Sequence, residues 1–321
     1  MAGFATAKRS IGFKIEETPY AAETLAATDY NVSAYSVEYE IDIPVKGRDL
    51  ARANYSRDVG TAGKRAATVR FSVDVMWSGT AATAPNYFKC LQACGLKQAT
   101  WGTTGVSLVT DSDYSNVPAT IEIVERDEGA SPLQLVFSVA GCMGNSKIVL
   151  GNIGEPARFD FEFKGFLNSI TDRPFASQIV PTGFNTTLPD AVLGATTTIF
   201  SESLRYNQFT IDLGNDVQLW SDPSKSHGYS GARIADRNPT LEIDPDMALL
   251  ATNAMYTRHI NNTTGSFSWN IGRITVSAPV AQIEQSFKPG DREGHVVNNL
   301  RFGLKRSLGN DELEILQGSK T

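Results

Sequence analysis

The sequence contains no long apolar run. No segment approaches the roughly 18 consecutive apolar residues that a membrane helix requires, and residues Met1 to Gly12 lack the apolar core of a signal peptide. These absences predict a soluble chain made without a secretion signal. Cysteine is also scarce: Cys90, Cys94 and Cys142 are an odd number in a chain of 321 residues. They do not indicate a disulfide framework, and reducing cytosol is the expected place of synthesis.

Cys90 and Cys94 lie four residues apart within Pro85 to Cys94. In this segment Tyr87, Phe88, Leu91 and Cys94 have the spacing of one apolar helix face. No second Cys or His pair accompanies the two cysteines, as a zinc or redox motif would require. We therefore expect a buried structural pair, with a metal or redox site as the alternative.

Catalytic motifs are missing as well. The chain has no Gly-x-Ser-x-Gly elbow, no dinucleotide fingerprint and no His-Glu-x-x-His. The segment from Gly60 to Lys64 ends like a phosphate loop but lacks its glycine spacing, and Gly141 to Gly144 and Gly151 to Gly154 are predicted to be turns between strands. None of the three histidines is within ligand spacing of another His or a Cys, so each is assigned to a loop or strand surface; they are His227, His259 and His295. We expect no catalytic residues, no cofactor and no metal.

Acidic residues recur in alternate positions of predicted strands, so each pair points to one face. The pairs are Glu40/Asp42, Asp160/Glu162 and Glu242/Asp244. A glycosidase would place such carboxylates beside clustered aromatic side chains. The four tryptophans are instead scattered, at 77, 101, 220 and 269. A solvated or assembly-facing acidic stripe is the preferred interpretation.

Charge and composition narrow the class of protein. Lys and Arg number 29 against 35 Asp and Glu, a net charge of −6. That balance argues against gripping DNA phosphates by counterion release, but it does not exclude a surface that lets DNA pass without sticking. With 41% hydrophobic residues the chain can bury a core, and its length fits two domains or one large one.

Most of the sequence alternates apolar and polar residues, which predicts half-buried antiparallel strands. Phe159, Phe161 and Phe163 should face a core, while Asp160 and Glu162 face outward. The predicted strands span 35–45, 68–76, 120–125, 133–139, 159–166, 209–213, 267–271, 300–304 and 312–317. The fold class is therefore mainly β.

Two short helices are predicted, each soon after a strand. The first spans Pro85 to Cys94 and ends before Gly95, which suits a left-handed cap. The second spans Pro245 to Tyr256, with Asp244 as its N-cap. This shared order of strand and helix indicates an internal repeat. We predict two tandem β-sandwich domains, each with a short α-helix, at residues 1–167 and 195–321, and a linker at 168–194 that is rich in Pro and Gly.

Two long polar stretches, Gly47 to Ala67 and Asn215 to Asn238, lie at corresponding positions between strands. Loops of this length are usually functional or ordered by a partner. We expect both stretches to lack order of their own in the free chain and to be ordered by contact with a partner. A mobile surface loop is the alternative.

Eight segments carry a further signal through their order along the chain. They are 13–25 (FKIEETPYAAETL), 63–76 (GKRAATVRFSVDVM), 84–95, 212–216 (DLGND), 228–239 (GYSGARIADRNP), 278–283, 291–294 and 309–313. Each is a weak signal alone, but together, over nearly the whole chain, their order resembles that of the major tail tube protein of long-tailed (siphovirus-type) bacteriophages. Under this resemblance the two long polar stretches would contact neighbouring subunits, mostly between stacked rings.

This resemblance implies a structural virion protein without enzymatic activity. Its β-sandwich domains would join into rings, and the rings would stack into a hollow tube that carries the genome into the host. The family has six-fold or pseudo-six-fold symmetry, so a duplicated chain would close a ring as a trimer. The implied partners are further copies of the chain, the tape measure and other tail proteins; DNA would pass through an acidic lumen without sequence-specific binding, and no membrane is involved. The implied location is the phage tail, after synthesis in the bacterial host cytoplasm.

Two alternatives remain open at this stage. One is another virion component, such as a baseplate or decoration protein. The other, from a different class, is a carbohydrate-binding β-sandwich module or an enzyme, which should show a localised aromatic pocket with carboxylates or a metal.

Overall fold

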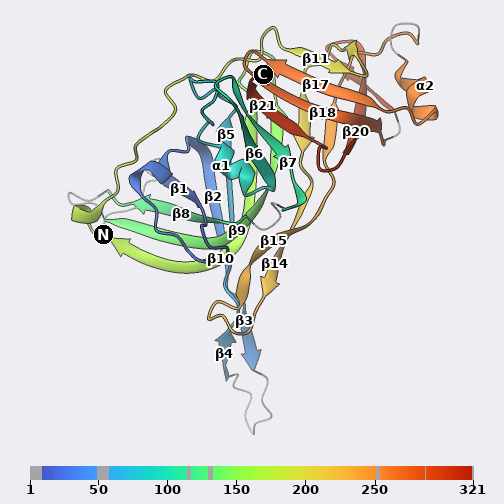
Figure 1. The fold of residues 1–321 in the computed structure, drawn as a ribbon. Coiled ribbons are helices and arrows are strands. Elements are labelled where there is room, and N and C mark those ends of the chain that lie inside the picture. The colour runs from blue at the N-terminus through green and yellow to red at the C-terminus, as the bar shows by residue number, and fades with distance from the viewer. Residues whose placement is uncertain are drawn as a thin grey trace.

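The computed structural model describes residues 9–48, 58–113, 117–128, 133–250, 254–285 and 287–319. Within these residues the chain is mainly β and antiparallel, with one sheet of 17 strands, two 2-stranded sheets and two short α-helices. The predicted mainly β sandwich class with short helices is confirmed. Figure 1 shows the earlier and later parts of the chain side by side, with two ribbons projecting from the body.

The earlier part of the chain carries ten strands, one α-helix and a 3-10 helix at Ala27–Tyr30. Its elements are β1 (Ser10–Ile15), β2 (Ala34–Asp42), β3 (Val45–Arg48), β4 (Asp58–Ala62), β5 (Ala66–Asp74), α1 (Phe88–Gln92), β6 (Leu96–Trp101), β7 (Gly105–Thr110), β8 (Ala119–Arg126), β9 (Gln134–Leu150) and β10 (Arg158–Arg173).

The later part follows a 3-10 helix at Phe175–Ser177 and an extended connection. Its elements are β11 (Thr196–Ile199), β12 (Glu202–Ser203), β13 (Phe209–Asp212), β14 (Asn215–Ser221), β15 (Tyr229–Arg237), β16 (Thr240–Ile243), α2 (Met255–Ile260), β17 (Gly265–Ile271), β18 (Ile274–Ile283), β19 (Lys288–Arg292), β20 (His295–Lys305) and β21 (Glu314–Gly318).

Strand pairing follows the same order in both parts. The earlier part pairs as β2-β5-β10-β9-β8-β1 and the later part as β13-β16-β20-β18-β17-β11. A hairpin is inserted after the first strand of each set and a short helix after the second. Pairs also cross between the parts, β13 with β9 and β21 with β7. The division into residues 1–167, 168–194 and 195–321 therefore stays a prediction.

The register gives residue-level equivalences between the two parts. β10 pairs with β9 on both sides of an irregularity between Lys164 and Phe166. In the later part β20 and β21 both pair with β18, and the segment 306–313 separates them. Lys164 lies opposite Met143, and Lys305 lies opposite Val280. Across each break the partner strand moves by three residues, from Met143 to Ala140 and from Val280 to Ser277, so Lys164 and Met143 correspond to Lys305 and Val280.

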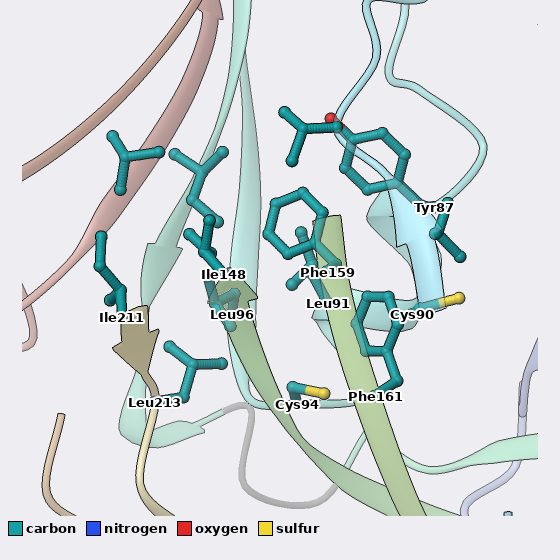
Figure 2. Close-up of a cluster of buried hydrophobic side chains, with 14 of the residues drawn as sticks. Tyr87, Cys90, Leu91, Cys94, Leu96, Ile148, Phe159, Phe161, Ile211 and Leu213 are labelled. Atoms are coloured by element: carbon teal, nitrogen blue, oxygen red, sulfur yellow. The ribbon is translucent and has the colours of Figure 1, made fainter. Parts of the chain in front are cut away.

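The core lies under β10, as the alternation predicted. Phe159, Phe161 and Phe163 are at most 3% exposed, whereas Asp160 and Glu162 are half-buried on the other face. Phe163 contacts Phe13 at a ring-centroid distance of 5.2 Å, and Phe159 contacts Tyr87 at 5.0 Å. Figure 2 shows this cluster continuing from Tyr87 and Phe159 to side chains on β9 and β13. One apolar core therefore underlies both parts of the chain.

The helix predicted over Pro245 to Tyr256 is wrong in position. α2 begins only at Met255, because the preceding backbone is occupied by other partners. Asp246 forms a β-bridge with Val297, and the Met247 amide donates to the Val296 carbonyl at 3.0 Å. The first predicted helix, at Pro85 to Cys94, exists but is shorter, since α1 covers Phe88–Gln92.

Gly141 to Gly144, predicted as a turn, lies inside β9, whereas Gly151 to Gly154 is a turn, as expected. The glycines allow close packing instead of chain reversal. A Cβ on Gly144 would lie 2.5 Å from the Phe163 ring, and Gly141 has a φ of +61°, where side chains are strained. β9 thereby continues for 17 residues and reaches the later part of the chain.

The two long polar stretches are not loops without structure. Asn215 to Asn238 forms the antiparallel hairpin β14–β15, and the described part of Gly47 to Ala67 forms the hairpin β3–β4. Residues 49–57 of the first stretch lie outside the described residues. We call these hairpins the second arm and the first arm. Figure 1 shows both arms pointing the same way from the body, with β3–β4 farther out.

Candidate assembly surfaces

A series of residues that lie opposite one another on adjacent strands crosses both parts of the chain. It runs over β2, β5, β10, β9, β13, β16, β20 and β18, so eight strands form one continuous surface. Its members in that order are Tyr35, Ser72, Asp160, Lys147, Asp212, Thr240, Gly303 and Gln282. The step from Lys147 to Asp212 is the joint between the two parts. We call the solvent-facing side of these strands the polar face.

The polar face carries closely spaced charges of both signs, with acidic residues prominent. Arg70 pairs with Glu162 at 2.9 Å, and the Ser72 hydroxyl donates to Asp160 at 2.6 Å. An open groove of about 490 Å³ lies along this surface, lined by these side chains and by Lys147. Within this groove Glu162 is engaged by a cation and Asp160 by a hydroxyl, as in a hydrated polar surface.

Asp212 anchors the joint between β9 and β13. It accepts hydrogen bonds from the Asn145 amide and the Gly214 backbone, both at 2.8 Å, and pairs with Lys147 at 3.0 Å. Burial alone would raise the pKa of Asp212, but these partners outweigh burial and lower that pKa below its ordinary value. Lys147 has a raised pKa, through its bond to Asp212 first and the attraction of nearby carboxylates second.

Asn215 closes the same joint from the base of the second arm. Its side-chain amide donates to the Cys94 carbonyl at 2.7 Å and the Gly144 carbonyl at 3.0 Å. Its backbone amide donates to the Asn145 side chain at 3.0 Å. These bonds satisfy carbonyls that strand pairing leaves over. The two parts are thus held by polar side chains as well as by the shared core.

β2 is an edge strand on the same surface. Among the described residues it pairs only with β5. Val37, Tyr39 and Ile41 point to the core but are half-buried, while Glu38, Glu40 and Asp42 are exposed. Charged edge residues discourage indiscriminate strand pairing. The equivalent strand β13 differs, because it pairs with β16 on one side and β9 on the other.

The second arm packs against its own chain. Val217, Ala232 and Ile234 form a cluster with the fully buried Met143 of β9, and Leu219 packs on it. The Lys164 ammonium donates to the Val217 carbonyl at 3.4 Å. This arm is therefore docked on the pair β9–β10.

The tip of the second arm reaches the base of the first. The Arg65 amide donates to the His227 carbonyl at 3.0 Å, and the Lys64 ammonium donates to the Ser221 hydroxyl at 2.5 Å. The His227 ring stacks on Phe166 at a centroid distance of 3.7 Å. The two arms thus meet within one chain.

The first arm, by contrast, offers apolar side chains to solvent. Ile43, just before the arm, is 38% exposed, Val45 is 67% exposed and Val59 is 89% exposed. Every described side chain of β3 is exposed. A two-stranded hairpin is marginal alone in water. This arm is the described segment whose packing is least complete.

The predicted burial of Cys90 and Cys94 is confirmed: both are 0% exposed, as is Cys142. Burial raises the pKa of Cys90 to about 12 and that of the other two as well. Thiols held protonated in this way are poor nucleophiles and poor ligands.

The three histidines and the segment from Gly60 to Lys64 do not come together in one site. His227 stacks in the arm contact, His259 packs edge-on against Phe287, and His295 is exposed at the start of β20. Lys64 lies over the Tyr229 ring at 5.1 Å. In the part of the chain that the structure describes, no group of three or more His, Cys, Asp and Glu side chains could hold a metal ion.

The acidic pairs follow the prediction except at one residue. Glu40/Asp42 and Asp160/Glu162 lie on the polar face. Glu242 is exposed there too, but Asp244 is only 7% exposed, which corrects its place in the stripe. It accepts bonds from the backbone amides of Asn207 and Gln208 and pairs with Arg292 at 2.8 Å, because the chain leaves β16 after Ile243.

The tryptophans occupy separate surroundings, as their sequence positions indicated. Trp269 is buried against Phe209, whereas Trp220 is 53% exposed under Arg233. Trp77 lies under Arg273, and the Trp101 indole donates to Ser107 at 2.9 Å. They do not form the shared aromatic platform that a sugar site would use.

Sequence reasoning missed the residues of the joint. Asn145 lies inside β9, while Asp212 ends β13 and Asn215 begins β14, and only the strand pairing brings the three together. The one local signal is Gly214, whose φ is +63° and whose Cβ would lie 2.1 Å from the Asn238 carbonyl oxygen. It marks where β13 turns into the second arm.

Comparison with known proteins adds no relationship: the chain matches no family model and no curated protein. Among the helices that the structure describes, none is long and apolar enough to cross a membrane.

Proposed function

We propose that this chain is a structural subunit that polymerises into the hollow tail tube of a long-tailed bacteriophage, through which genomic DNA passes to the host. The observation that carries the proposal is the eight-strand surface crossing both parts of the chain, with β2 unpaired on its outer edge among the described residues. The resemblance in segment order supplies the class of assembly.

The contact between β9 and β13 within the chain suggests how two copies of the chain would join. β13 covers the edge of β9 at Lys147. By the register equivalences, β2 corresponds to β13, Glu38 to Asp212, Gln282 to Asn145 and Glu284 to Lys147. β18 ends at Ile283, but the Glu284 amide still donates to the Arg301 carbonyl at 3.0 Å, so Glu284 stays beside β20. β2 of one copy would therefore extend the sheet of the next copy beside Glu284.

Repeating this joint closes a ring. The resemblance implies pseudo-six-fold symmetry, and a chain with two similar parts reaches it with three copies. The polar face would then line the ring, with Glu38, Glu40, Asp42 and Glu242 among its exposed groups. Excess negative charge on such a wall repels DNA phosphates, and the chain's net charge of −6 accords with this.

Electron microscopy of the purified chain tests the proposal. We expect rings of three copies that stack into hollow tubes as the concentration rises, with mass photometry giving three chains per ring. A chain that stays monomeric at high concentration, or forms solid fibres or flat sheets, would overturn it. Binding to a panel of polysaccharides, with no rings, would favour the carbohydrate-binding alternative.

A further inference from the structure

The two arms occupy equivalent positions but have unequal surroundings. Val45 lies opposite Ala62 in the first arm, and Leu219 lies opposite Ala232 in the second. Counting back from these pairs, Ile43 corresponds to Val217. Val217 is 6% exposed and Ala232 is 0% exposed, whereas Ile43 and Val45 are 38% and 67% exposed. The same apolar side of the arm is covered in one case and open in the other.

Residues of β9 and β10 cover the apolar side of the second arm. Val217 and Leu219 lie against Met143 of β9, and Lys164 of β10 bonds to the Val217 carbonyl. Met143 and Lys164 correspond to Val280 of β18 and Lys305 of β20. Val280 is half-buried and Pro279 beside it is exposed. Equivalent residues therefore lie on the later part of the chain without an arm on them among the described residues, and Lys305 there pairs with Glu284 at 2.5 Å.

We propose that the first arm of one copy docks on β18 and β20 of a second copy, with Ile43 and Val45 over Val280 and the Lys305 ammonium bonded to the Ile43 carbonyl. This inference rests on the proposed function and adds its partner contact. The ring joint brings β2 of one copy beside β18 of the next. The first arm continues from β2, so it reaches this surface in the same step.

The occupant is a second copy because a chain cannot dock its own first arm there. Within one chain β2 and β18 lie at opposite ends of the eight-strand surface, a separation on the order of 30 Å at the usual strand spacing. The second arm lands on β9–β10, which precede β13, the strand that leads into that arm. For the first arm, that preceding part belongs to another copy.

A cysteine pair tests the contact directly. The variant Val45→Cys/Val280→Cys, treated with a short bismaleimide under ring-forming conditions, should link neighbouring chains covalently. The three native cysteines are 0% exposed and should not react in the folded protein. The matched control is Thr61→Cys/Val280→Cys: Thr61 is exposed on the same arm, but it lies opposite Lys46, the neighbour of Val45, and so points to the opposite side from Val45.

The outcomes separate this inference from the proposed function. Linking by V45C/V280C at least several-fold above the control supports docking. Rings that form without this excess overturn docking and leave the assembly standing, whereas absence of rings and of links overturns both. The double variant Ile43→Ser/Val45→Ser should fold normally by circular dichroism and raise the concentration needed for rings about ten-fold. An unchanged ring threshold would also overturn docking.

Discussion

β2 and β13 hold the same place in the two parts of the chain, yet among the described residues only β13 is paired on both edges. The inward side chain Ile211 of β13 is 1% exposed, while Val37 of β2 is half-buried. The first arm is likewise more exposed than the second. Within one chain, β13 and the second arm are thus covered by other strands, whereas β2 and the first arm leave the equivalent groups exposed. This asymmetry supports the proposed joint between copies of the chain.

The largest expected difference is in the cost of truncating the two strands. Ile211→Ala should lower the free energy of unfolding of the monomer by about 3 kcal/mol, because it leaves a cavity under the joint. Val37→Ala should cost about 1 kcal/mol or less in the monomer, since its side chain is already half in water. Urea unfolding below the ring-forming concentration measures both. Equal costs would mean that β2 is as fully packed as β13.

The arms offer the next test. A Cβ on Gly231 would lie 2.0 Å from the Tyr20 ring, at a φ of +155°. Tyr20 cannot easily yield, because its backbone amide donates to Glu16 at 2.7 Å and its own φ is +66°. Gly231→Ala should destabilise the protein by about 1–3 kcal/mol and speed amide exchange in β14–β15.

The matched control for that variant is Gly47→Ala in the first arm, where the added Cβ meets nothing within 4 Å. Its monomer stability should change by a few tenths of a kcal/mol at most. If G47A were as harmful as G231A, the first arm would already be packed in the monomer.

Acid should weaken the joint through Asp212. The folded pKa of Asp212 is below its ordinary value of 3.8. Its stabilising contribution is therefore complete above the unfolded pKa and is lost as the pH falls through the folded pKa. Asp212→Asn should cost about 1 kcal/mol at pH 7 and progressively less as the pH falls through the folded pKa. Unfolding curves from pH 7 to pH 2 check this; a cost that grows on acidification would contradict the sign.

The smallest effect is expected on the polar face away from the joint. Arg70 and Glu162 form an ion pair whose side chains are 47% and 42% exposed. Replacing both with Ala should change monomer stability by about 0.5 kcal/mol or less, because exposed pairs contribute little. A double-mutant cycle measures their coupling, and a coupling well above 1 kcal/mol would show that this surface is less hydrated than its exposure indicates.

The sequence predicts features that depend on neighbouring residues and misses those that depend on partners far along the chain. Alternation placed β10 and its three buried phenylalanines correctly, because a period of two is a property of neighbouring residues. The burial of Cys90 and Cys94 followed from helix-face spacing in the same way. Asp244 looked like a helix cap but is held by Arg292, 48 residues later. Local spacing carries no information about such a partner.

The arms and the joint show the same limit. The polar stretches looked disordered because their apolar residues are few, yet Val217 and Ile234 are buried by Met143, which lies on another strand pair. The tail tube assignment, the lack of catalysis and the domain boundaries stay predictions, since they depend on assembly and activity.

A disulfide across the proposed ring joint tests the central claim most directly. Residues directly opposite on antiparallel strands have Cα atoms about 4.5–5.5 Å apart, which a disulfide spans. Glu38→Cys/Glu284→Cys should therefore oxidise, under ring-forming conditions, to covalent species that end at a closed trimer on a non-reducing gel. The control Glu38→Cys/Thr210→Cys, with Thr210 on β13 in the middle of the same surface, should stay monomeric. Oxidised E38C/E284C that remains monomeric while rings form would contradict the account.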